Sequence, residues 1–120
     1  SGGVFGTVAK SLVNERNAYV CAASFVKGAV RHIITQDYSD IKKCQGSKYV
    51  QSSLEDCLPR IKGILKDKQK TVLFCGTPCQ VAAVYSFLGE RPSNLYTLDL
   101  ICHGVPSPLF FLKDLKQNIK

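Results

Sequence analysis

Three cysteines lie in two short segments whose composition suits redox or metal chemistry. Cys75 and Cys79 belong to the segment 74–80, FCGTPCQ, and Cys102 belongs to the segment 100–108, LICHGVPSP. Each segment follows an apolar run expected to form a buried strand and leads into a run expected to form a helix. In open α/β sheets, cofactors bind at the carboxyl ends of strands, beside helix N-termini. The two segments therefore predict a site at one edge of a sheet.

The thiols of these segments admit several kinds of chemistry, because thiolates bind iron–sulfur clusters or zinc and also act as nucleophiles. Cys79 is expected near the start of a helix, where free N–H groups favour the thiolate. Cys102 precedes His103, so a Cys–His nucleophile is an alternative, although neighbours on an extended segment point opposite ways. A cubane cluster needs four ligands, and Cys75 could equally point into the core. Either further ligands come from outside this chain, or the cysteines are structural.

Hydrophobic patterning predicts an α/β fold, with a mixed, largely parallel sheet and flanking helices in a single domain that spans residues 1–120. Strands 71–75 and 95–101 are joined by a helical segment, so they are expected to be parallel neighbours. Their carboxyl ends would then bring Cys79 and Cys102 close together. The expected elements are a helix over 3–15, strands over 19–25 and 29–34 with a Lys27-Gly28 turn, a helix from Ser52 or nearer Asp56, a strand over 71–75, a helix ended by Gly89, a strand over 95–101 and a helix after Ser107.

Capping signals locate the starts of two helices. Thr77 can cap the helix that opens with Pro78, and Gln80 completes a capping box. Ser52 and the glutamate three residues later form a second such box. Pro59 would kink that helix if it lay deep inside it, whereas a start near Asp56 would leave the proline in the first turn.

The composition of the 120 residues is that of one globular domain, with a net charge of +7. A solvated basic face is the favoured interpretation of this charge; an anionic cofactor or acidic partner comes next, and nucleic acid last because no reader motif is present. No apolar stretch is long enough to cross a bilayer and no secretory signal is visible, so a cytoplasmic location is expected.

Cys21, Cys44 and Cys57 lack a second thiol at the spacing of metal ligands and are expected to fill the core.

Two glycine-rich segments could meet an anion. Ser1, Gly2 and Gly3 lie at the start of the first predicted helix, where free N–H groups are available; a flexible start is the alternative. A loop over 46–48, GSK, places Lys48 beside small residues that would let a phosphate or an anionic ring approach.

Four motifs in register make the chain recognisable as a whole: SGGVF at 1–5, GSKYVQS at 46–52, GTPCQ at 76–80 and CHGVPS at 102–107. The set closely resembles the coenzyme F420 hydrogenase/dehydrogenase beta-subunit family, in the N-terminal portion of its catalytic region. The resemblance implies a flavin- and iron–sulfur-dependent oxidoreductase. In this family electrons pass between a [4Fe-4S] cluster, FAD and a deazaflavin, coenzyme F420, or another acceptor.

The resemblance also implies roles for individual residues. Cys79 and Cys102 would be cluster ligands, with Cys75 as a third candidate, and residues around the flavin or its partner would be Ser1, Gly2, Gly3, Gly46, Ser47, Lys48 and Thr77. The implied partners are a ferredoxin-like domain or another electron-transfer subunit and a small-molecule redox substrate. Because relatives are longer, the chain is expected to be a fragment that is inactive alone. The alternatives are a non-catalytic interaction domain and a cysteine-nucleophile enzyme; the sequence identifies no catalytic residue.

Overall fold

Three parallel strands and one antiparallel strand form the central sheet of this computed structural model, which describes residues 2–45, 54 and 56–99. The strands are β1 (Tyr19–Val26), β2 (Ala29–Thr35), β3 (Val72–Gly76) and β4 (Leu95–Asp99), in the spatial order β2-β1-β3-β4. β1 pairs with β3 and β3 with β4 in parallel, whereas β2 is antiparallel to β1. The predicted mixed, largely parallel α/β sheet in a single domain is therefore confirmed.

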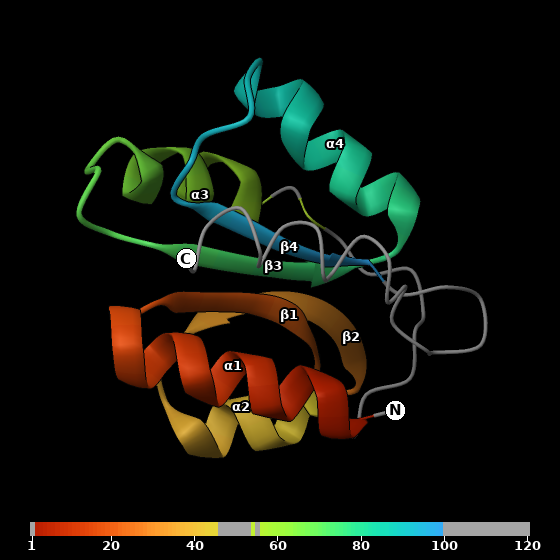
Figure 1. The fold of residues 1–120 in the computed structure, drawn as a ribbon. Coiled ribbons are helices and arrows are strands. Elements are labelled where there is room, and N and C mark those ends of the chain that lie inside the picture. Colours follow the sequence, from red (N-terminus) through yellow and green to blue (C-terminus); the bar gives the residue numbers. More distant parts are fainter. Residues whose placement is uncertain (1, 46–53, 55, 100–120) are drawn as a thin grey trace.

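Helices cover both faces of the sheet, as Figure 1 shows. α1 (Gly2–Arg16) and α2 (Tyr38–Gln45) lie on one face, and α3 (Cys57–Leu65) and α4 (Pro78–Leu88) on the other. Each face has its own buried cluster. The residues under α1 and α2 include Phe5, Leu12, Ile41 and Leu73; those under α3 and α4 include Ile61, Phe74, Val81 and Val84. The sheet thus separates two hydrophobic layers.

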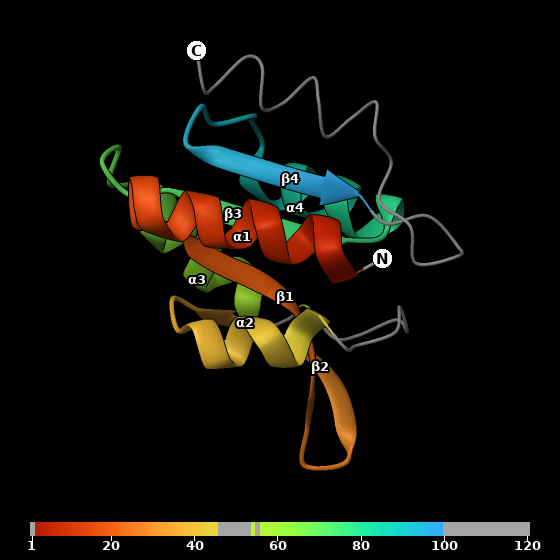
Figure 2. The same cartoon turned by 60° about the horizontal axis from the view of Figure 1, so that its bottom comes forward.

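The turn between β1 and β2 is built on two residues with positive φ. Lys27 has φ 49° and Gly28 has φ 80°, the left-handed pair that a two-residue hairpin of type I′ requires. Glycine adopts this conformation without steric cost, whereas Lys27 does so less readily. The hairpin predicted at Lys27-Gly28 is confirmed, and its tip extends beyond the rest of the sheet in Figure 2.

α3 begins later than the Ser52 capping box predicts. Its first residue is Cys57 and its N-cap is Asp56, which agrees with the later of the two predicted starts. Pro59 consequently lies in the first turn, where its missing N–H removes no helical hydrogen bond. Ser52 itself lies outside the described residues.

α2 has no counterpart in the elements expected from the sequence. Asp37 precedes it, and its Oδ1 accepts hydrogen bonds from the Ser39 N–H over 2.8 Å and the Ser39 hydroxyl over 2.9 Å. Among the residues of α2 whose burial the structure describes, Ile41 and Cys44, three residues apart, are buried. A helix of eight residues with a mostly polar composition offers few apolar positions from which it could be recognised.

α4 matches its prediction at both ends. Thr77 is the N-cap and Pro78 the first residue, and Gly89 ends the helix in the left-handed conformation at φ 73°. The Gly89 N–H donates to the Tyr85 carbonyl over 2.9 Å.

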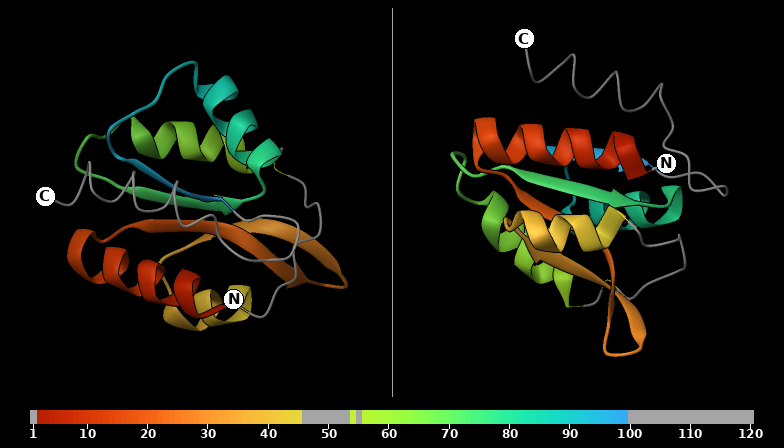
Figure 3. Two further views of the ribbon diagram at one scale, coloured as in Figure 1. Left: turned by 45° about the vertical axis from the view of Figure 1, so that its right-hand side comes forward. Right: turned by 90° about the horizontal axis from the view of Figure 1, so that it is seen from below.

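Among the described residues, 2–45, 54 and 56–99, no helix is both long and apolar enough to span a membrane. The further views in Figure 3 show the two helical layers on either side of the strands.

Candidate functional site

The carboxyl ends of β3 and β4 lie side by side. In the parallel register Gly76, the last residue of β3, pairs with Asp99, the last residue of β4. α4 begins immediately after β3, so its N-terminus opens at this edge. The N-terminal end of α1 lies at the same edge in the ribbon views of Figures 1–3. The positive ends of two helices therefore lie at the same edge of the sheet, an arrangement that favours negative charge there.

The start of α4 is held by reciprocal hydrogen bonds. The Thr77 N–H donates to Gln80 Oε1 over 3.0 Å, and the Gln80 N–H donates to Thr77 Oγ1 over 3.4 Å. This is the predicted capping box. Gln80 is buried, and its amide lies so close to Gly76 that a Cβ there would come within 2.7 Å of Oε1. The glycine thus permits the close packing of the strand end against the helix start.

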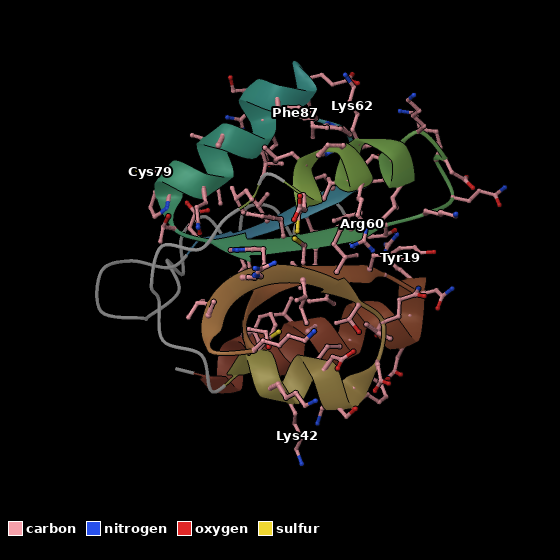
Figure 4. All side chains as sticks on the ribbon, turned by 180° about the vertical axis from the view of Figure 1, so that it is seen from behind. Tyr19, Lys42, Arg60, Lys62, Cys79 and Phe87 are labelled. Carbon is pink, nitrogen blue, oxygen red and sulfur yellow. The ribbon has the colours of Figure 1, made fainter. Side chains whose placement is uncertain are left out.

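Cys79 and Cys75 occupy opposite environments although they are four residues apart. Cys79, the second residue of α4, is exposed at the end of the helix that faces the candidate site (Figure 4). Cys75 is buried in the cluster under α1 and α2. Burial there raises the pKa of the Cys75 thiol to about 12, with smaller contributions from Cys44 and Asp99. The structure therefore presents Cys79 at the edge and places Cys75 in the core on the other face of the sheet.

His32, on β2, reaches across β1 to contact the end of β3. Its Nε2 lies 2.8 Å from the Cys75 carbonyl oxygen, and its ring stacks on Phe74 with centroids 5.1 Å apart. The side chain is buried, and this desolvation lowers the pKa of His32 below the ordinary 6.5. These contacts agree with the packing role that is most common for a histidine within a strand.

The other three described cysteines lie in the core, as expected for packing residues. Cys21, Cys44 and Cys57 are all buried, and the Cys57 thiol donates to the His32 carbonyl over 3.1 Å. A hydrogen bond to Cys57 raises the pKa of Cys21, and the same bond lowers the pKa of Cys57. Burial raises the pKa of Cys44 to about 11.

Only part of the expected site falls within the described residues. Gly2 and Gly3 form the first turn of α1, and they share the carboxyl edge with Thr77 and Cys79. The remaining candidates lie outside the described residues: Ser1, Gly46, Ser47, Lys48 and Cys102. In the part of the chain that the structure describes, no group of three His, Cys, Asp or Glu side chains could hold a metal ion.

Asp99 is a residue of this edge that the sequence analysis missed. It is buried at the end of β4, directly opposite Gly76 in the register. Its negative charge contributes to the raised pKa of Cys75. The signal for it was a single acidic residue inside the apolar run 95–101, LYTLDLI. A carboxylate is rarely buried without a partner or a role.

Comparison with known proteins finds a family similarity in the C-terminal part of the chain. Residues 69–120 match the family model for the C terminus of the coenzyme F420 hydrogenase/dehydrogenase beta chain. No curated protein and no solved structure gave a significant match. The match covers β3, α4, β4 and the segments of Cys79 and Cys102, so it includes two of the four motifs. This match supports the family expected from those motifs.

Proposed function

We propose that this chain is part of an oxidoreductase subunit that carries electrons between a [4Fe-4S] cluster, FAD and coenzyme F420 or another acceptor. The family match supports an oxidoreductase of the F420 hydrogenase/dehydrogenase type. The observation that carries the finer proposal is the parallel register of β3 and β4. It brings the ends of the two strands that precede Cys79 and Cys102 to one edge, inside the region that matches the family.

The register makes Cys79 and Cys102 suitable as a pair of cluster ligands. Cys79 follows Gly76 by three residues in the chain, and Cys102 follows Asp99 by three. Gly76 and Asp99 are partners on adjacent strands, and adjacent strands lie about 4.8 Å apart. Chain connectivity then keeps each cysteine within about 11 Å of its strand end. Cys79 is also exposed, as a ligand to a group bound at the edge must be.

Cys75 fits a ligand role less well than the other two cysteines. Its thiol lies among apolar side chains on the far side of the sheet from α4. A thiol whose pKa is raised to about 12 holds its proton, whereas a cluster ligand must be a thiolate. We therefore assign Cys75 to the core and expect the remaining ligands elsewhere in the polypeptide.

The two helix N-termini suit an anionic cofactor such as FAD. Gly2 and Gly3 have no side chains to block an approach to the N–H groups at the start of α1, and Thr77 offers a hydroxyl at the start of α4. Ser1, Gly46, Ser47 and Lys48 would complete this surface. When bound, FAD would supply hydride exchange with the acceptor, and a cluster would supply single-electron transfer. The N–H groups and Lys48 would orient the cofactor and favour its electron-rich form.

The partners follow from the same proposal. A beta subunit works with other subunits, and we propose a ferredoxin-like domain or another electron-transfer subunit as electron donor, with a small-molecule redox substrate. A cytoplasmic location also remains a proposal. Among the described residues, His32 is not available as a base for a Cys79 nucleophile, since its ring lies on Phe74 and its Nε2 lies against the Cys75 carbonyl.

Anaerobic reconstitution of the full-length polypeptide with iron, sulfide and FAD tests the proposal. We expect a brown protein with stoichiometric iron and flavin. A Cys79→Ala/Cys102→Ala variant should lose its iron while its circular dichroism spectrum is unchanged. Cys44→Ala, which removes a buried thiol on the other face of the sheet, is the matched control and should keep its iron. Full iron retention in the Cys79→Ala/Cys102→Ala variant, or a wild-type protein that takes up neither cofactor, would overturn the proposal.

A further inference from the structure

A basic hollow lies at the end of the molecule opposite the candidate site. α3 ends at Leu65 and α4 at Leu88, and between these ends is a hollow of about 290 Å³. Figure 4 shows Cys79 near one end of α4 and Phe87 toward the other, beside Lys62 on α3. We call this surface, made of the hollow and Phe87, the lysine hollow. A partner bound at the lysine hollow would therefore not cover the carboxyl edge of the sheet.

Positive charge dominates the lysine hollow. Lys62, Lys66 and Lys68 line it, and Glu90 is its acidic residue. All three lysines are exposed, and among the described residues no carboxylate lies within ion-pair distance of them. Lys62 complements the dipole of α3, because it lies in the last turn of the helix. That explanation does not extend to Lys68, which lies beyond the helix, so the charge is available to a partner.

Apolar side chains form the rest of the surface. Leu88 and Pro92 line the hollow itself. Phe87 is 43% exposed beside it, and the Lys62 Nζ lies 5.6 Å from the centroid of the phenyl ring. An exposed aromatic ring beside a cation combines the apolar anchor and the charged rim found at protein interfaces.

The turn that carries two of the lysines is held in place. Asn94 is buried, and its Nδ2 lies 3.2 Å from the Leu65 carbonyl oxygen, 3.2 Å from that of Asp67 and 2.8 Å from that of Lys70. These contacts tie residues 66–70 to the start of β4. The backbone that presents Lys66 and Lys68 is therefore ordered in advance, which reduces the entropy lost on binding.

We propose that the lysine hollow is the docking site of an acidic protein surface that inserts an apolar side chain between α3 and α4. Charge complementarity selects the partner, because three lysines surround the hollow and carboxylates would satisfy them. A hollow of this volume is at the lower limit for small-molecule sites and suits a single side chain. Nucleic acid fits less well, since single strands need a series of stacking aromatic rings. This inference is independent of the proposed redox function.

Isotope-labelled protein titrated with a short peptide of alternating glutamate and leucine tests the inference by NMR. Amide shifts should be confined to α3, residues 66–70 and the C-terminal end of α4, and the affinity should fall as salt is added. Replacing glutamate by glutamine in the peptide should remove most of the binding. Phe87→Ser should weaken binding of the acidic peptide without changing its salt dependence.

Charge reversal supplies the decisive comparison. K62E/K66E/K68E should weaken peptide binding about tenfold or more. K10E/K27E/K42E makes the same change in net charge at exposed positions of α1, α2 and the hairpin turn, and it should have less than about a twofold effect. If the first variant does not fold, K62Q/K66Q/K68Q removes the charge without reversing it. Equal effects of the two triple variants, shifts elsewhere on the molecule, or tighter binding of duplex DNA than of peptide would overturn the proposal. Iron and flavin content should be unchanged in both triple variants.

Discussion

Gly76→Ala should destabilise the protein, because the strand end and the start of α4 leave no room for a methyl group. A Cβ at this position would lie 2.7 Å from Gln80 Oε1 and 2.9 Å from Phe74 Cε2. Phe74 is fully buried and cannot move freely. Gln80 could move, but its Oε1 would then no longer accept the Thr77 N–H. The substitution therefore forces either overpacking or the loss of half the capping box.

The expected cost follows from these contacts. Overpacking a core costs about 1–3 kcal/mol, and a lost hydrogen bond costs about 0.5–1.5 kcal/mol. The reduced freedom of the unfolded chain offsets about 0.4–1 kcal/mol. The Gln80 side chain can relieve part of the overpacking by giving up its hydrogen bond to the Thr77 N–H, so the two costs do not add in full. We therefore expect the free energy of unfolding to fall by about 1–3 kcal/mol. The melting temperature should then fall by about 4 °C for each kcal/mol.

Urea unfolding followed by circular dichroism measures the effect, with Gly63→Ala as the matched control. A Cβ at Gly63, inside α3, would meet nothing within 4 Å. That variant should be more stable than wild type by about 0.5–1 kcal/mol, because alanine favours the helix. Gln80→Ala removes one of the two obstacles, so Gly76→Ala should cost less in that background. A Gly76→Ala protein that is as stable as wild type would refute the packing argument.

Three further predictions concern the cap, the thiols and the response to pH. Thr77→Ala should lower the free energy of unfolding by about 1 kcal/mol, whereas Thr77→Ser should keep most of the stability, because serine retains the capping hydroxyl. Urea midpoints measure both variants, and equal losses of stability would contradict the role of the hydroxyl. Iodoacetamide at neutral pH should label Cys79 in the native protein long before Cys75, which is buried with a pKa of about 12; peptide mass mapping measures both rates, and equal rates would contradict the placement of Cys75. The pKa of His32 is lowered in the folded protein, so the unfolded chain binds more protons and stability should fall as pH drops below about 6.5. Urea midpoints between about pH 7 and pH 5 should show this loss in the wild type and a smaller one in His32→Gln; equal slopes would exclude His32 as its source.

Local signals determined how much of the fold could be predicted. The hairpin at Lys27-Gly28, the start of α4 at Pro78 and its end at Gly89 each depend on residues adjacent in the chain. α2 was missed because its stability comes from packing against α1 and β1 rather than from a long apolar stripe. The start of α3 was left between two positions, since Ser52 and Asp56 both resemble caps and only the folded chain selects between them.

The candidate site was predictable in its position and less so in its members. Parallel pairing of β3 and β4 follows from the strand-helix-strand order, so the shared edge could be expected. Alternate residues of a strand point to opposite faces of the sheet, so the direction of Cys75 depends on which residues of β3 face which helices. Both faces of β3 are buried. Its continuous apolar run therefore carries no alternation from which the direction could be read. Asp99 was missed although it is the acidic residue of an apolar run, because its position opposite Gly76 follows from the strand register and not from the sequence.

The separation of Cys75 and Cys79 by the sheet has a consequence for disulfide formation when the protein is oxidised. Their C-x-x-x-C spacing suggests a dithiol that could close into a ring, yet one sulfur lies beneath α1 and the other is in water at the start of α4. A disulfide needs Cβ atoms about 4 Å apart, so these two cannot join while β3 remains in place. A disulfide at Cys79 would therefore need a second sulfur other than that of Cys75, in another part of the polypeptide or in a neighbouring molecule.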